Sequence, residues 1–145
     1  MSMSTNLKHP AMNQPTPEHP FKSKSFWHSL GFACNGLRFA FHSERNLRTH
    51  AALTLMVLSA GCYFRISRWE WALLIMCIVI MVAVELINTA LEYLVDMLVD
   101  GQYNDYARRV KDIAAGACLT TAIGTAIIGA LIFWPYIWSY WHGGL

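Results

Sequence analysis

Charged residues are scarce in this chain. They make up only 14% of its 145 residues, whereas hydrophobic residues make up 55%. Because soluble domains contain about 25% charged residues, this composition excludes an ordinary soluble domain and indicates an integral membrane protein. The formal net charge is only +2, so it gives no support for a nucleic-acid partner.

Metal-type cysteine pairs are also missing, and prolines are scarce after residue 24. The four cysteines form no Cys-x-x-Cys pair and no Cys/His spacing, so we interpret them as small apolar residues. All but one of the five prolines lie in residues 1–24, which are polar and show no apolar period. We expect residues 1–24 to be a disordered tail, and residues 25–145 to form one membrane domain.

Long apolar segments are abundant after the tail. Residues of about 47–64, 69–99 and 106–134 are each apolar enough to cross a bilayer core of ~30 Å, which requires about 20 helical residues. Residues 25–43 place aromatic and leucine side chains on one side and polar side chains on much of the other. This pattern predicts an amphipathic surface helix, with a cytosolic packing helix as the alternative. The predicted fold class is therefore an all-α membrane protein with one surface helix and three spans.

Basic residues indicate how these spans are oriented. Of the 11 lysines and arginines, only Arg65 and Arg68 lie between the first and second spans. The others lie before the first span or in its first turn, or in the first turns of the third span. By the positive-inside rule, the N-terminal tail is cytoplasmic and the C-terminus is outside. Tryptophans and tyrosines of residues 134–141 then form an aromatic belt on the outer side.

Polar residues interrupt the second apolar segment near its cytoplasmic end. Glu85, Asn88 and Glu92 fall on one stripe of a helix, and Asp96 continues it. A charged group at membrane depth costs ~2.5–3.5 kcal/mol on insertion scales, and such groups are usually functional. Carboxylate and amide oxygens suit a hard divalent cation and a general base. Glu44 and the pair at 111–112 are expected at the same cytoplasmic level.

Three ordered motifs carry a resemblance to a known family. Their sequences are Glu-Arg-Asn-Leu-Arg-Thr-His (44–50), Glu-Leu-Ile-Asn-Thr-Ala-Leu-Glu (85–92) and Lys-Asp-Ile-Ala-Ala-Gly-Ala (111–117). Over residues of about 25–135 the chain resembles the prokaryotic diacylglycerol kinase family, small three-span membrane kinases that include undecaprenol kinases. The first two motifs look more like the undecaprenol kinase branch, because the diacylglycerol-specific branch tends to lack a histidine at position 50.

This resemblance implies an activity, cofactors and an assembly. It implies a homotrimer in the bacterial inner (plasma) membrane that uses ATP and Mg²⁺ to phosphorylate a lipid alcohol. Undecaprenol is the expected alcohol, and diacylglycerol is the alternative. The chain contains no P-loop and no protein-kinase motif set, so we expect it to hold ATP by another route.

The resemblance also assigns roles to individual residues. Glu85 matches the general base that accepts the proton of the lipid hydroxyl, and Glu44 and Glu92 match the positions that hold the metal. Structural alternatives exist for each: a helix-packing ion pair for Glu85, a salt bridge with Arg48 for Glu44, and a solvated helix end for Glu92.

The nucleotide is expected to contact Lys111, Asp112 and Asn88. A lysine at the phosphates neutralises charge that develops in phosphoryl transfer. The structural alternatives are a complement to the helix dipole for Asp112 and an interhelical hydrogen bond for Asn88. Weaker candidates for phosphate or lipid contacts are Arg48, Asn46 and His50.

Two other classes of protein compete with a kinase. A small proton-coupled transporter also places a glutamate in a helical bundle, and an accessory subunit requires no chemistry. A transporter usually requires only one or two acids at mid-membrane. Acidic, amide and lysine groups from three segments at one interface instead favour a phosphate ligand with a metal.

Overall fold

The structure, a computed structural model, describes residues 25–143, so the prediction of a disordered tail lies outside the described residues. Four helices account for most of this part: α1 (Phe26–Ser43), α2 (Arg45–Phe64), α3 (Arg68–Val99) and α4 (Asp105–Trp141). Residues 25–143 contain no β-strand. The predicted all-α class is confirmed.

Two of the helices, α3 and α4, are long and apolar enough to cross a membrane. Helix α2 does not meet that criterion, because its first turns carry Arg45, Arg48 and His50. The expected third span, 106–134, lies within α4, but α4 continues through Pro135 to Trp141. Proline removes one backbone donor, and its presence alone does not end this helix.

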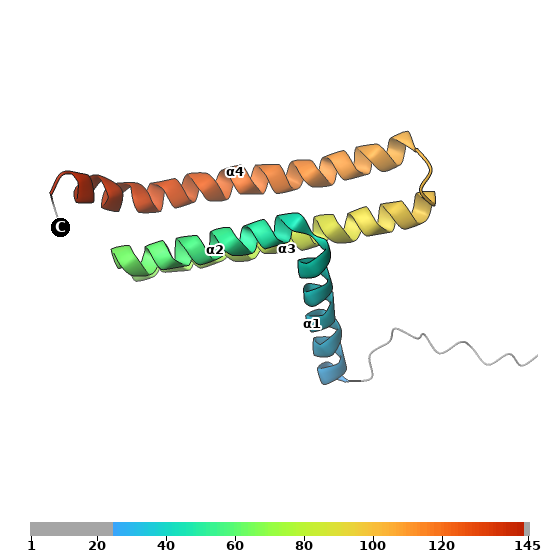
Figure 1. The fold of residues 1–145 in the computed structure, drawn as a ribbon, viewed down its shortest axis with the longest axis horizontal. Coiled ribbons are helices and arrows are strands. Elements are labelled where there is room, and N and C mark those ends of the chain that lie inside the picture. The colour runs from blue at the N-terminus through green and yellow to red at the C-terminus, as the bar shows by residue number, and fades with distance from the viewer. Residues whose placement is uncertain (1–24, 144–145) are drawn as a thin grey trace, which may run out of the picture.

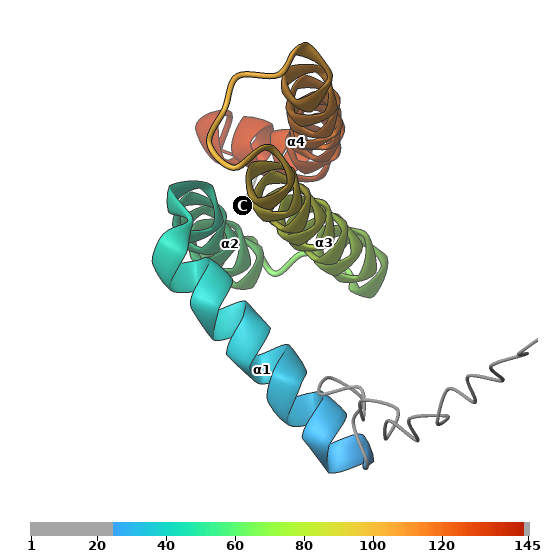
Figure 2. The same ribbon diagram turned by 90° about the vertical axis from the view of Figure 1, so that its right-hand side faces the viewer.

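Helix α3 is the central element of the bundle. It packs against both α2 and α4, and Figure 1 shows α3 and α4 running side by side in opposite directions, joined by the turn at 100–104. Helix α1 leaves the bundle at a steep angle to the other three helices (Figures 1 and 2). This direction is the one expected of a helix that lies in the membrane plane while its neighbours cross the bilayer.

A polar cluster fixes the first turn of α3 and ties it to α4. The Glu70 carboxylate accepts a hydrogen bond from the Ser67 backbone N–H at 2.7 Å, and the Ser67 hydroxyl accepts one from the Glu70 N–H at 3.4 Å. This reciprocal arrangement is a capping box, which satisfies donors that the first helical turn leaves free. The Tyr136 hydroxyl donates to the same Glu70 carboxylate at 2.7 Å. The end of α4 is therefore attached to the start of α3.

Beside this cluster, α2 and α3 approach closely at a glycine. Ile66, Leu74 and Ile132 form a buried apolar core with partly buried Phe64 and Trp71 around it. A Cβ atom at Gly61 would lie 2.9 Å from a ring carbon of Trp71 and 3.2 Å from Ile66 Cδ1. The missing side chain at position 61 therefore lets the indole pack directly on the α2 backbone.

Replacing Gly61 with valine is expected to destabilise the fold by about 1–3 kcal/mol, because the new side chain overlaps the indole. Gly124→Val is the matched control, since nothing lies within 4 Å of a Cβ at that helical position. Unfolding of the purified protein by SDS titration in mixed micelles measures both. Equal loss of stability in the two variants would contradict the packing described for Gly61.

Candidate active site at the polar end of the bundle

Three polar residues are buried along the inner face of α3. Glu85 is 3% exposed, Asn88 is 7% exposed and Thr89 is 6% exposed. They continue the apolar face that Leu74 and Met81 form deeper in the bundle. The sequence analysis singled out Glu85 and Asn88 but missed Thr89, which lies one turn from Glu85. A threonine in an apolar run carries no signal by itself, because its hydroxyl usually bonds to its own helix.

Asn88 connects the buried part of this face with its more exposed end. Its side-chain N–H donates to the Glu92 carboxylate at 2.7 Å. Its Oδ1 atom is buried and has no hydrogen-bond partner among residues 25–143. A buried acceptor without a partner costs about 1–3 kcal/mol. The amide oxygen is therefore free to accept a donor or to coordinate a cation.

Helices α2 and α4 both reach the level of Glu85. On α4, the Cys118 thiol lies 3.9 Å from the Val84 carbonyl oxygen and interacts with the Glu85 side chain. On the other side, Leu47 of α2 and Val82 of α3 line one cavity. No lysine or arginine of residues 25–143 forms an ion pair with Glu85. The helix-packing ion pair considered as its structural alternative is therefore not present in this part of the chain.

Lys111 does not lie at Glu85. Its ammonium group forms an ion pair of 2.5 Å with Asp96, and the two side chains are 36% and 62% exposed. Asp96 lies about three helical turns, ~16 Å, beyond Glu85 along α3. The structure therefore joins Lys111 to the exposed end of the acidic stripe, and Asp96 is the partner that holds it there.

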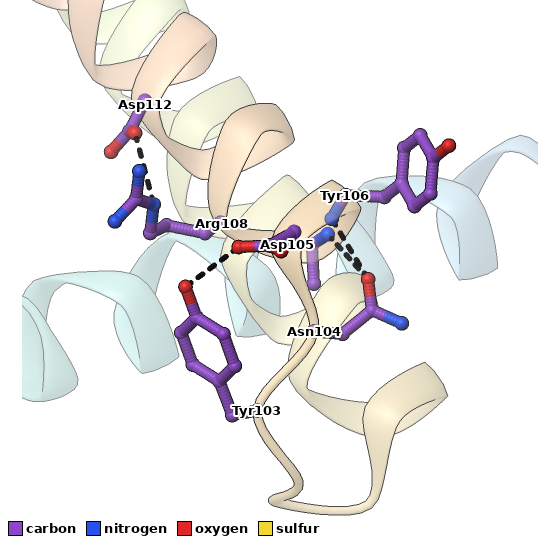
Figure 3. A network of polar contacts seen from close by, with 7 residues as sticks. Tyr103, Asn104, Asp105, Tyr106, Arg108 and Asp112 are labelled. Carbon is purple, nitrogen blue, oxygen red and sulfur yellow. Dashed lines mark hydrogen bonds and ion pairs between the residues drawn. The ribbon is translucent and has the colours of Figure 1, made fainter.

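Asp112 belongs to a polar network at the turn between α3 and α4. The Asp112 carboxylate lies 3.9 Å from the Arg108 guanidinium, and both side chains are exposed (Figure 3). The Tyr103 hydroxyl donates to the Asp105 carboxylate at 2.7 Å, and this hydrogen bond raises the pKa of Tyr103. Asn104 caps α4 by accepting from the Tyr106 and Ala107 N–H groups at 2.9 and 3.2 Å. These contacts order the turn that precedes Lys111.

The first predicted motif lies where α1 meets α2. Glu44 is half-buried and separates the two helices, and its N–H donates to the Ala40 carbonyl. Arg48 donates to the His42 carbonyl at 2.7 Å and, within residues 25–143, makes no ion pair with Glu44. Asn46 is exposed, and His50 lines a cavity deeper in the bundle. Glu44 therefore has no cation partner in the described part of the chain.

Comparison with known proteins identifies the family. A family model described as prokaryotic diacylglycerol kinase matches residues 31–133. The chain belongs to the prokaryotic diacylglycerol kinase family. The resemblance that the three motifs carry is thereby confirmed, and so is the prediction of a lipid kinase.

Individual relatives of this diacylglycerol kinase family member carry two different names. The chain is 36% identical over 118 residues to the undecaprenol kinase of Bacillus subtilis (strain 168). The alignment covers 81% of this chain and 95% of that protein. It is 34% identical over 111 residues to a diacylglycerol kinase of Synechocystis sp., covering 77% of this chain and 63% of the relative. It is 26% identical over 108 residues to the diacylglycerol kinase of Escherichia coli (strain K12). That alignment covers 74% of this chain and 88% of the relative.

For this family member, the Asp96–Lys111 ion pair is expected to contribute little to stability. Exposed pairs contribute at most about 1 kcal/mol, so Asp96→Asn should change the free energy of unfolding by less than that. SDS titration of the variant beside wild type measures the change. A loss well above 1 kcal/mol would show that the pair holds α3 and α4 together, in conflict with its exposure.

Proposed function

We propose that this chain transfers the γ-phosphate of ATP to undecaprenol and so produces undecaprenyl phosphate. The observation that carries the proposal is the buried Glu85 carboxylate, placed where an apolar helix reaches its polar end. The likeness to an undecaprenol kinase over 95% of that protein's length supports this choice of lipid. Diacylglycerol is the alternative, supported by the relatives that carry the name diacylglycerol kinase.

Glu85 acts as the general base in the proposed reaction. Its carboxylate takes the proton of the lipid hydroxyl while that oxygen forms a bond to the γ-phosphorus. The bond from this phosphorus to the bridging oxygen breaks, and ADP leaves with the electron pair. Removal of water strengthens electrostatic interactions, which suits a base that is 3% exposed. The unpartnered Asn88 oxygen lies one turn away, where it can accept from the hydroxyl or orient it.

Three of the predicted residues, Asn88, Glu92 and Glu44, also fit a magnesium ion by their chemistry. Glu92 and Glu44 offer carboxylate oxygens, and the orphaned Asn88 oxygen is a further hard donor. No group of three His, Cys, Asp or Glu residues in the described chain converges on one point. This donor set suits Mg²⁺, which keeps several waters and uses one or two carboxylates beside substrate phosphates. When bound, Mg²⁺ neutralises charge on the phosphates, and Glu44 and Glu92 hold it.

The nucleotide binds toward the cytoplasmic end of the same face. Lys111 presents a compact charge to the β- and γ-phosphates, and Asp96 positions its ammonium group. Asp112 contacts the nucleotide from the next position, with its partner Arg108 beside it. Arg48 and Asn46 contribute phosphate or lipid-headgroup contacts from the start of α2. These assignments place the phosphates between the buried base and the aqueous phase.

The proposed topology has three spans in the bacterial inner membrane. Helices α3 and α4 are apolar enough to cross it, and α2 contains 20 residues, about the number that a bilayer core requires. The excess of basic residues on one side favours a cytoplasmic N-terminus and active site. The C-terminus then lies outside, together with the aromatic end of α4.

We also propose that the chain forms a homotrimer through α3. A stripe of apolar residues on α3 follows the alternating three- and four-residue spacing of a coiled coil. All of its members are exposed in the single chain. They are Leu73, Met76, Ile80, Ala83, Ile87, Ala90, Leu94 and Met97. Its two alanines lie two residues before Glu85 and two residues after Asn88, and small residues permit close helix approach.

Glu85→Gln is expected to lower kcat by about 10²–10⁴-fold, because an amide cannot accept the hydroxyl proton. Phosphate transfer from labelled ATP with Mg²⁺ in detergent micelles measures this, with undecaprenol and diacylglycerol offered separately. Glu70→Gln is the control, because Glu70 is also a carboxylate on α3 but lies at the opposite end of the bundle. This variant should keep most of the activity. Full activity of Glu85→Gln would rule out Glu85 as the base.

The same assay distinguishes the proposed substrates. Faster transfer to undecaprenol supports the carrier-lipid assignment, whereas faster transfer to diacylglycerol would replace undecaprenol with the alternative. No transfer to either lipid by the folded protein would contradict a lipid kinase and favour a transporter, for which pH-driven flux in vesicles is the measurement.

A further inference from the structure

Cys118 differs from the polar side chains that follow it on α4 in the helix with which it bonds. The hydroxyls of Thr120, Thr121 and Thr125 donate to carbonyl oxygens of α4 itself, at 2.8, 2.9 and 2.9 Å. This return to the preceding turn is the usual choice of a hydroxyl inside a helix. The Cys118 thiol instead points at α3, where the Val84 carbonyl oxygen lies 3.9 Å from its sulfur atom.

The same thiol also reaches the Glu85 carboxylate. Glu85 follows Val84 in α3, is 3% exposed, and interacts through its side chain with Cys118. Of the side chains in residues 25–143, only that of Cys118 donates a hydrogen bond to Glu85. A buried carboxylate requires donors that replace the water it has lost. The thiol is therefore the donor that the bundle itself supplies to this carboxylate.

The packing of α4 fixes the depth of this thiol. Lys111, Ala114 and Cys118 lie on one face of α4, because they are three and four residues apart. Lys111 contacts Asp96 at the exposed end of that face, and Ala114 between them is 7% exposed. A small side chain at position 114 lets the two helices approach closely. The face that brings lysine to the acidic stripe therefore also brings the thiol to Glu85.

The thiol has one proton and two acceptors within reach. An ionised oxygen accepts a stronger hydrogen bond than a neutral carbonyl oxygen does. While Glu85 is ionised, the thiol therefore donates to the carboxylate. Once Glu85 has accepted a proton, the Val84 carbonyl competes with a neutral acid. The thiol proton thus has an acceptor both before and after a proton transfer to Glu85.

We propose that Cys118 is a positioning residue for the general base. Its thiol holds one oxygen of the Glu85 carboxylate and leaves the other oxygen for the lipid hydroxyl. The inference rests on the proposed lipid kinase function and adds a residue of α4 that acts through Glu85. The last torsion of a glutamate side chain has broad energy wells, so a carboxylate without a donor rotates. A donor on a second helix restricts that rotation, and loss of alignment in a base lowers the rate more than it lowers substrate affinity.

Substitutions at position 118 separate a hydrogen bond from packing. Cys118→Val keeps an apolar side chain but removes the donor, whereas Cys118→Ser keeps a donor. Thr121→Val is the matched control, since Thr121 lies one turn away and its hydroxyl bonds to its own helix. Full-length variants in micelles are compared with wild type for kcat and for KM toward the lipid alcohol and toward Mg-ATP. SDS titration checks that each variant is folded.

We expect kcat to fall about 3- to 10-fold in Cys118→Val, the range for loss of one weak hydrogen bond, with both KM values unchanged. Cys118→Ser should keep more activity than Cys118→Val, and Thr121→Val should match wild type. Wild-type kcat in folded Cys118→Val would overturn the proposal. A higher kcat in Cys118→Val than in Cys118→Ser would also overturn it, because a packing role favours the apolar side chain.

The S–H stretching band of Cys118 tests the contact without any turnover. Subtracting the infrared spectrum of Cys118→Val from that of wild type isolates this band from those of the other cysteines. A stronger hydrogen bond lowers the stretching frequency. The band should therefore move to higher frequency when the same subtraction is made in the Glu85→Gln background, where the acceptor is neutral. An identical band in the two backgrounds would overturn the contact between thiol and carboxylate.

Failure of the proposed function gives a different result. If wild type phosphorylates neither lipid, the kinase function fails before any variant is compared. The positioning role then fails with it, whereas the infrared band still decides whether Cys118 donates to Glu85. If wild type prefers diacylglycerol, the same variants are measured on that lipid, and the same order of kcat values is required.

Discussion

The cost of burying polar groups inside an apolar bundle constrains the rest of this structure. Glu85, Asn88 and Thr89 are the buried polar residues of the described chain, and they lie together on one helix that otherwise presents apolar side chains. Such burial requires compensation from neighbouring groups or from a ligand. The Asn88–Glu92 hydrogen bond compensates one donor, whereas the Asn88 oxygen has no partner within residues 25–143. A ligand that donates to this oxygen or is coordinated by it would complete the compensation.

Contacts along the length of α3 fix the position of α4 beside this polar face. Helix α4 supplies Cys118 next to Glu85 and Lys111 next to Asp96. The antiparallel packing of α4 on α3 therefore brings α4 side chains to the acidic stripe at two different depths. The Tyr136–Glu70 hydrogen bond at the far end holds the same pair of helices together. With both ends attached, α4 cannot slide along α3 without breaking one of these contacts. The register that brings lysine to the acidic stripe is thus set partly by a capping box at the opposite end.

Hydropathy and helix periodicity predicted the all-α class, the extents of α1 and α3, and a shared face for Glu85 and Asn88. These features depend on local spacing, which a sequence displays directly. The partner of Lys111 was not predicted, since pairing with Asp96 depends on the length of the intervening turn. The continuation of α4 past Pro135 was missed in the expected span, because the contact of Tyr136 with Glu70 joins residues far apart in the chain. Thr89 was missed because its burial depends on the packing of neighbouring helices.

Depth along α3 separates three kinds of chemistry. At the exposed end of the stripe, Asp96 and Lys111 are accessible to solvent and carry opposite charges, which suits contact with a soluble, charged nucleotide. About two to three turns deeper, Asn88 and Glu85 are buried and polar, which suits a proton transfer kept from bulk water. Below them the face becomes apolar and lines an open cavity. This order matches the order of parts in a phosphorylated lipid alcohol, with the phosphate outermost, the hydroxyl oxygen next and the hydrocarbon chain deepest. A single helix face can therefore align both substrates of a lipid kinase, because the membrane itself supplies the axis along which they are sorted.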